Sequence, residues 1–145
     1  MWEHEHSVVA DVTPEAVWRI WSDIDDLPAW NDGIESIELH GPFATGTEFT
    51  MKPPGREAVA MRLAAVVENE LLTEEVQLEG LVIQVIHRLE RLPAGRTEIT
   101  YRTEITGPAA DELGPHVGPG ITASVPETVA RLVERATASS GGARP

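Results

Sequence analysis

Two residues of this sequence could perform proton chemistry together. His87 and Tyr101 each share one face of a predicted strand with apolar residues. If a tight loop at residues 93–95 joins the two strands, side chains facing the same way pair with an even sum of residue numbers, so His87 lies across from Tyr101 or Thr103. A histidine takes a proton near neutrality and a phenol holds or returns one, which an enolising cyclisation or dehydration of a poly-ketone requires. A buried histidine hydrogen-bonded to a tyrosine is also a common structural arrangement, and both interpretations stay open.

The other histidines offer a metal site as an alternative. His4 and His6 lie two residues apart on one strand face and could join His87 as three nitrogen ligands. The last strand separates them from His87, and the sequence indicates no carboxylate or carbonyl that would hydrogen-bond and orient the three rings, so we expect no metal and no cofactor. The sequence also lacks a Gly-x-Ser-x-Gly motif, a phosphate-binding glycine loop and a His-Glu-x-x-His motif, which leaves serine hydrolysis, nucleotide chemistry and metallopeptidase activity without support.

The elements that would position these residues follow from periodicity. Alternating polarity predicts a half-buried strand over residues 2–12. Thr13-Pro14 then reads as a helix cap followed by proline at the first helical position, and a second short helix or turn is expected over 26–31. Short segments bounded by glycine or proline predict six further strands. Their expected positions are 34–40, 46–52, 58–68, 71–79, 81–91 and 97–106.

The C-terminal part of the chain carries the longest helical pattern. Apolar residues spaced by three and four predict an amphipathic helix over 121–138, which Pro126 should kink. Residues 109–120 contain two prolines and three glycines, so we expect a ragged first turn or a loop there. We expect one domain over residues 1–138 and a disordered tail over 139–145.

Composition narrows the class of partner. The chain has 145 residues, no cysteine and a formal net charge of −13. This negative field would repel phosphate backbones and anionic lipids, so nucleic-acid and membrane-surface binding are not expected. No apolar run approaches the roughly 20 residues that span a bilayer, and no targeting segment is evident, so we expect no membrane insertion and a cytoplasmic location. We expect a monomer or a homodimer.

The order strand, two helices, six strands and a long helix resembles the helix-grip fold, and the local sequence agrees. The Pro-Glu-x-Val-Trp start of the first helix at 14–18, the Pro-x-Trp-Asn at 28–31 and the Gly-x-x-Phe at 46–49 resemble the START-like, Bet v 1-like (SRPBCC) superfamily, in its polyketide cyclase/dehydratase and lipid-transport branch. The resemblance covers residues 4–136. It implies an α+β fold in which a curved antiparallel seven-stranded sheet wraps around a long C-terminal helix, with two short helices between strands 1 and 2.

A bent sheet that closes on one helix leaves a space between them, and apolar walls with few polar groups make such a space a ligand cavity. The main expectation is therefore a protein that binds a hydrophobic small molecule, such as a lipid, quinone or polyketide, for carriage or sensing. The alternative is a polyketide cyclase/dehydratase-type enzyme with His87 and Tyr101 as acid/base groups, and a weaker one is an interaction protein with a collapsed core. The expected lining residues are Trp30, Phe49, Met51, Met61, Leu63, His87, Tyr101, Val125 and Val129.

Overall fold

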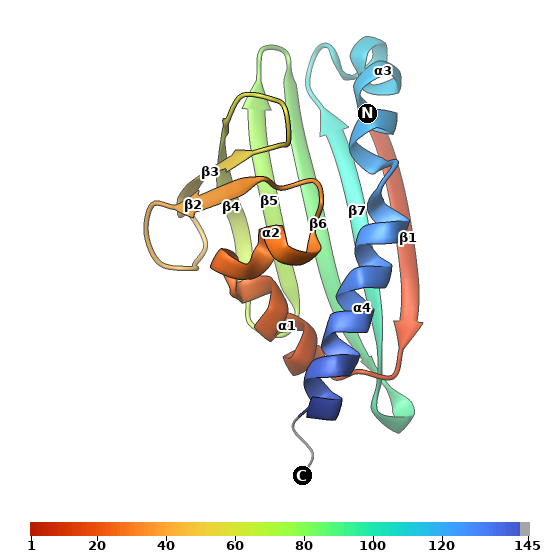
Figure 1. Cartoon of the computed structure of the whole chain (residues 1–145). Helices are drawn as coiled ribbons and strands as arrows, with labels where there is room; N and C mark the ends of the chain where they lie inside the picture. Colours follow the sequence, from red (N-terminus) through yellow and green to blue (C-terminus); the bar gives the residue numbers. More distant parts are fainter. Residues whose placement is uncertain (143–145) are drawn as a thin grey trace.

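The computed structural model describes the backbone of residues 1–142 and the side chains of residues 1–138. It contains one antiparallel sheet with the strand order β1-β7-β6-β5-β4-β3-β2 (Figure 1). The seven strands are β1 (Trp2–Ala10), β2 (Ser36–Leu39), β3 (Glu48–Lys52), β4 (Val59–Val67), β5 (Leu71–Leu78), β6 (Leu81–Leu92) and β7 (Arg96–Thr106). Together with the helices below, this confirms the predicted α+β helix-grip fold.

The short helices between β1 and β2 begin as the sequence indicates. The helix α1 (Pro14–Ser22) has its N-cap at Thr13, whose side-chain oxygen accepts a hydrogen bond from the Ala16 amide at 3.1 Å. A 3₁₀ turn η1 (Ile24–Asp26) and a short helix α2 (Leu27–Trp30) follow directly. Proline in the first turn of both α1 and α2 loses no hydrogen bond, because the first amides of a helix have no intrahelical partner.

The C-terminal segment differs from the expectation in two respects, and the first concerns residues 109–120. A ragged first turn or a loop was expected over residues 109–120, yet α3 (Ala110–Thr122) is helical and includes Pro115 and Pro119. Both prolines are exposed, and the Leu113 and Ala123 amides still bond to the carbonyls of Ala109 and Pro119. Packing against the sheet therefore outweighs the low helix propensity of the segment.

Pro126 marks the second difference, because the expected continuous helix over 121–138 is interrupted. The helix α4 (Val125–Gly142) begins after a break at Ala123 and Ser124, and Pro126 lies in its first turn. A proline there ends the preceding hydrogen-bond ladder without cost to the helix that it starts. Since α4 runs to Gly142, it includes part of the segment predicted as a tail, and residues 143–145 lie outside the described part of the chain.

The helices α3 and α4 run along the β1–β7 side of the sheet (Figure 1). Three α4 side chains, Val129, Leu132 and Ala136, are completely buried in the main core. The face of α3 that meets the sheet presents two glycines four residues apart, Gly114 and Gly118, and the Trp2 side chain lies against both. This close approach holds α3 against the first residues of β1.

We expect Gly114→Ala to destabilise the fold, although alanine is the better helix former by about 1 kcal/mol. An added Cβ at Gly114 would lie 2.5 Å from the Cβ of Trp2, an atom that cannot move without the β1 backbone. Overpacking of this kind costs roughly 1–3 kcal/mol. Gly120→Ala in the same helix is the control, because nothing lies within 4 Å of an added Cβ, and it should raise stability. Urea unfolding of both variants tests this, and a stabilised Gly114→Ala protein would contradict it.

Candidate functional site

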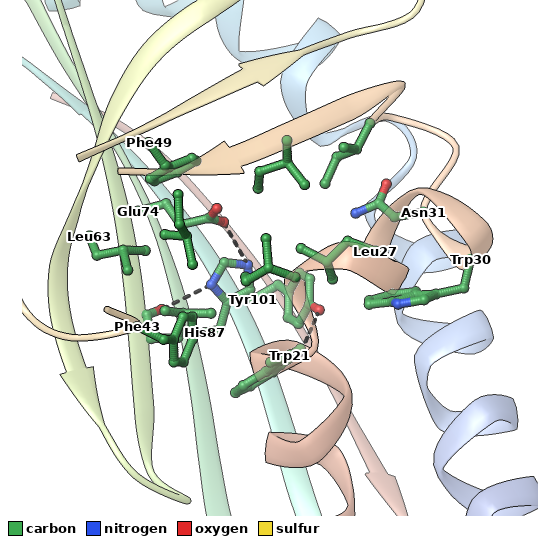
Figure 2. A pocket seen from close by; sticks show the side chains of 15 residues that line it. Trp21, Leu27, Trp30, Asn31, Phe43, Phe49, Leu63, Glu74, His87 and Tyr101 are labelled. Atoms are coloured by element: carbon green, nitrogen blue, oxygen red, sulfur yellow. Dashed lines mark hydrogen bonds and ion pairs between the residues drawn. The ribbon is translucent and has the colours of Figure 1, made fainter. Parts of the chain in front are cut away.

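A pocket opens on the inner face of the sheet, beside the segment formed by η1 and α2 (Figure 2). Its walls are mostly apolar and aromatic. The lining consists of Trp21, Ile24, Leu27, Trp30, Asn31, Ile34, Ile37, Leu39, Phe43, Phe49, Leu63, Leu72, Glu74, His87 and Tyr101. The volume is about 50 Å³, where one water needs roughly 10–15 Å³ and a drug-sized ligand roughly 300–1,000 Å³. The pocket as it stands therefore has room for only a few waters.

The predicted neighbours His87 and Tyr101 are confirmed as a directly opposed pair of β6 and β7. Both side chains are buried, and their ring centroids lie 4.4 Å apart with the planes at 89°, an edge-to-face contact. The two rings touch through this packing contact, and the hydrogen bonds of each go to other groups.

The hydrogen bonds of His87 define its tautomer. Nδ1 lies 2.9 Å from the carbonyl oxygen of Leu72, and a carbonyl only accepts, so Nδ1 carries the hydrogen and donates it. In the neutral ring, Nε2 is then the unprotonated acceptor. It faces Oε1 of Glu74 at 3.6 Å, beyond a normal hydrogen bond (Figure 2).

Glu74 is the functional candidate that sequence reasoning missed. It lies on β5 opposite Leu63 of β4 and Val85 of β6, so its side chain points to the inner face between apolar neighbours. Burial raises the pKa of the Glu74 carboxyl above its usual 4.5, and the nearby His87 lowers it by a smaller amount. The signal was present in the sequence, because Leu72 and Val76 fix the inward parity of β5 and Glu74 shares it.

Tyr101 is held by a second residue that was not assigned to the site. The indole Nε1 of Trp21 donates a hydrogen bond to the Tyr101 hydroxyl oxygen at 3.1 Å. Burial raises the pKa of the Tyr101 phenol above its ordinary value of 10.0. The phenol therefore keeps its proton, and within residues 1–138 its only hydrogen bond is the one it accepts from Trp21. Its O–H is free to donate to a guest in the pocket.

The remaining predicted lining residues separate into two groups. Trp30, Phe49 and Leu63 line the pocket, and the buried Nε1 of Trp30 has no hydrogen-bond partner. The other four pack in or against the main core without lining the pocket: Met51, Met61, Val125 and Val129. Strand parity turned the two methionines inward as expected, but the pocket does not extend to them.

The histidines of β1 do not approach His87. His6 lies opposite Tyr101 and His4 opposite Thr103, so β7 stands between them and His87. Within the described residues, no group of three His, Asp or Glu side chains is placed to hold a metal ion. In the same part of the chain, no helix is long and apolar enough to cross a membrane.

An antiparallel sheet that grips a C-terminal helix above an apolar pocket defines a ligand-binding fold of the helix-grip type. The chain belongs to the family described as polyketide cyclase/dehydrase and lipid transport, whose model matches residues 1–137. The resemblance drawn from the sequence is thereby confirmed. A search of the curated proteins finds no match.

Similar solved structures are Bet v 1-like. The crystal structure of Ara h 8.0201 has a TM-score of 0.73 and 18% identity, over 94% of this chain and 98% of that one. A truncated norcoclaurine synthase from Thalictrum flavum has a TM-score of 0.70 and 16% identity, over 91% and 92%. A hypothetical protein from Helicobacter pylori has a TM-score of 0.73 and 15% identity, over 93% and 88%. At these identities the likeness shows the fold alone.

We expect two adjacent glutamates to affect stability in opposite directions. Because the folded-state pKa of Glu74 is raised, its stabilising contribution is present below 4.5 and is lost as the pH rises through the folded value. Glu74→Gln should therefore stabilise the protein at pH 8 by roughly 0.5–2 kcal/mol, as replacing a strained functional group commonly does. The gain should shrink at pH 4.

Glu75 on the outer face provides the matched comparison. Arg62 and Gln84 donate to its carboxylate, each at 2.8 Å, and these bonds lower its pKa. Its contribution is therefore present above 4.5 and is lost as the pH falls through the folded value. Glu75→Gln should cost about 1–3 kcal/mol at pH 8. Urea unfolding at pH 8 and pH 4 measures both variants, and a change of the same sign at pH 8 would refute the assignment.

Proposed function

We propose that this protein binds a neutral, largely apolar small molecule in the pocket, for carriage or sensing. The observation that carries the proposal is the composition of the lining, in which eleven aliphatic or aromatic side chains besides Tyr101 surround a few polar groups. Small-molecule sites have this character, with apolar walls for affinity and isolated polar groups for orientation. A ligand such as a lipid, a quinone or a polyketide fits it.

A guest of that size requires the mouth of the pocket to open. The segment at the mouth, η1 and α2, contributes Ile24, Leu27 and Trp30 to the lining. Two arginines of α4 pair with carboxylates in and just after this segment: Arg135 pairs with Asp26, where η1 meets α2, and Arg131 with Asp32, two residues after α2, at 2.6 Å. Ion pairs this exposed contribute at most about 1 kcal/mol each, so the main cost of displacing the segment is the exposure of its buried Leu27 and Trp30 side chains.

The charge of the lining favours a neutral guest. Among residues 1–138, no lysine or arginine lines the pocket, and Glu74 is the only carboxyl group that does. A carboxylate ligand would lose its hydration without gaining a cationic partner, which is strongly unfavourable. A carbonyl or hydroxyl oxygen, in contrast, could accept from the free Tyr101 O–H and from the unpartnered Trp30 Nε1.

The second candidate is an enzyme of the cyclase/dehydratase type. It is favoured by His87 Nε2, which in the neutral ring is a proton acceptor, and which lies beside Glu74 and within the same pocket as the Tyr101 hydroxyl. A proton acceptor and a hydrogen-bond donor in an apolar pocket are the groups that enolisation needs.

Ile37 and Glu38 of β2 allow a direct test of the site. Ile37 lines the pocket, and Glu38 is exposed on the opposite face of the same edge strand. Ile37→Trp should fill the pocket and weaken binding of the neutral probe 2-acetonaphthone at least tenfold, or about 1.4 kcal/mol. Glu38→Trp should leave the affinity within twofold. Equilibrium dialysis measures both, and equal affinities would place the ligand elsewhere.

A matched pair of probes tests the charge preference. At pH 8 the anion 2-naphthoate should bind at least tenfold more weakly than 2-acetonaphthone, because it meets Glu74 and no cation in the lining. The difference in affinity between the two probes should be smaller in the Glu74→Gln variant, because glutamine removes the repelling charge and keeps the shape of the side chain. Tighter binding of the naphthoate to the unmodified protein would be incompatible with a neutral ligand.

A further inference from the structure

The pocket gives a separate role to each of three residues: Glu74, His87 and Tyr101. These roles rest on the proposed ligand pocket. We propose that Glu74 is the group that takes a proton from a bound ketone, that His87 Nε2 receives this proton from Glu74, and that the Tyr101 hydroxyl binds the ketone oxygen. The pocket would then exchange the α-hydrogens of its guest with water.

The position of Glu74 supports its role as base. Its carboxyl group lines the pocket, on the inner face of β5 between Leu63 and Val85, and no arginine or lysine lies beside it there. The outward-facing Glu75 is instead bound by Arg62 and two glutamine amides. A carboxylate without such partners is the more basic one, and burial accordingly raises the pKa of Glu74 while these bonds lower that of Glu75.

His87 is positioned to take the proton onward. Its Nδ1–H is committed to the Leu72 carbonyl at 2.9 Å, which leaves the Nε2 lone pair facing Glu74 Oε1 at 3.6 Å. A movement of less than 1 Å brings these atoms within hydrogen-bond distance. Of the side chains that the structure describes, three titratable ones line the pocket: Glu74, His87 and Tyr101. The histidine acts through Glu74 and is a positioning and relay residue.

Tyr101 acts as a hydrogen-bond donor and does not transfer a proton as an acid or base. Its pKa is raised by burial, so it does not ionise at working pH, and its oxygen already accepts the Trp21 N–H. What remains is the O–H, a donor fixed in direction by that bond. Donors of this kind stabilise the negative oxygen that develops on a reacting carbonyl.

The proton-transfer step balances without a co-reactant. The α-carbon of the ketone gives its hydrogen as a proton to the Glu74 carboxylate, the C–H electron pair becomes the C=C bond, and the carbonyl π pair moves to oxygen. The enolate oxygen accepts the Tyr101 O–H. Glu74 passes the proton to His87 Nε2, which trades it with water. A solvent-derived proton or deuteron then returns from His87 through Glu74 to carbon, which regenerates the ketone, the Glu74 carboxylate and the neutral His87 ring.

Deuterium exchange into the methyl group of 2-acetonaphthone, followed by proton NMR in D₂O, tests the proposal. The protein should accelerate exchange over an equal concentration of acetate and imidazole. Glu74→Gln should lower the protein-dependent rate about a hundredfold or more, the usual contribution of a general base, with the affinity from dialysis unchanged within threefold. Tyr101→Phe should lower it on the order of a hundredfold.

Two further variants complete the design. Glu90 is exposed on the same strand as His87, and the Glu90→Gln variant should catalyse deuterium exchange into the ketone at the same rate as the unmodified protein. His87→Gln, whose amide can still donate to the Leu72 carbonyl but cannot take a proton, should lower the exchange rate on the order of tenfold or more with the affinity from dialysis unchanged, and a merely structural histidine would leave this rate in place. Binding without exchange, or full exchange in folded Glu74→Gln, would overturn this proposal and leave the ligand pocket standing. Failure of the ketone to bind would overturn the ligand pocket itself and this proposal with it.

Discussion

The inner face of the sheet is wider than the helices that pack against it, and the site exists because of that difference. The helices α3 and α4 make their contacts with β1 and β7, and α1 packs between α4 and β6. The inner face of β3 to β5 is left to the short segment of η1 and α2 and to the curl of the sheet itself (Figure 1). A hollow remains where these elements meet, since side chains of fixed volume cannot close every gap between a helix and a bent sheet.

Because the helices cover the inner face of the sheet only in part, a polar side chain finds different partners on the inner and outer faces. Glu74 and Glu75 are neighbours in sequence with the same side chain, yet one points into the hollow and the other into a set of donors on the outer face. Tight partners make Glu75 a stabilising group, and their absence makes Glu74 reactive. Strained and incompletely satisfied groups of this kind are usual at functional sites, where they oppose stability and persist for their chemistry.

Much of this arrangement follows from simple periodicity. The even sum of residue numbers limited the partner of His87 to Tyr101 or Thr103, because strand parity and a short loop leave few registers, and the structure pairs His87 with Tyr101. The start of α1 was likewise predictable, because it is determined by two adjacent residues, the N-cap Thr13 and Pro14. Sequence reasoning failed where the answer depends on distant packing. The helicity of α3 depends on Trp2 lying against Gly114, more than a hundred residues away. The extent of the pocket, which takes in Ile37 but not Met51, depends on where the helices end.

Glu74 shows how binding and proton chemistry become linked in such a site. An apolar guest that displaces the few waters of the pocket lowers the polarizability around the carboxyl group and raises its pKa further. By thermodynamic reciprocity, protonation of Glu74 strengthens the binding of that guest by the same factor. The guest thus makes Glu74 a stronger base at the moment when it is present to be deprotonated. The same coupling disfavours a permanently anionic guest, which would meet the carboxyl group in its charged form. An apolar wall and one poorly solvated carboxylate are therefore sufficient to connect ligand choice with proton transfer.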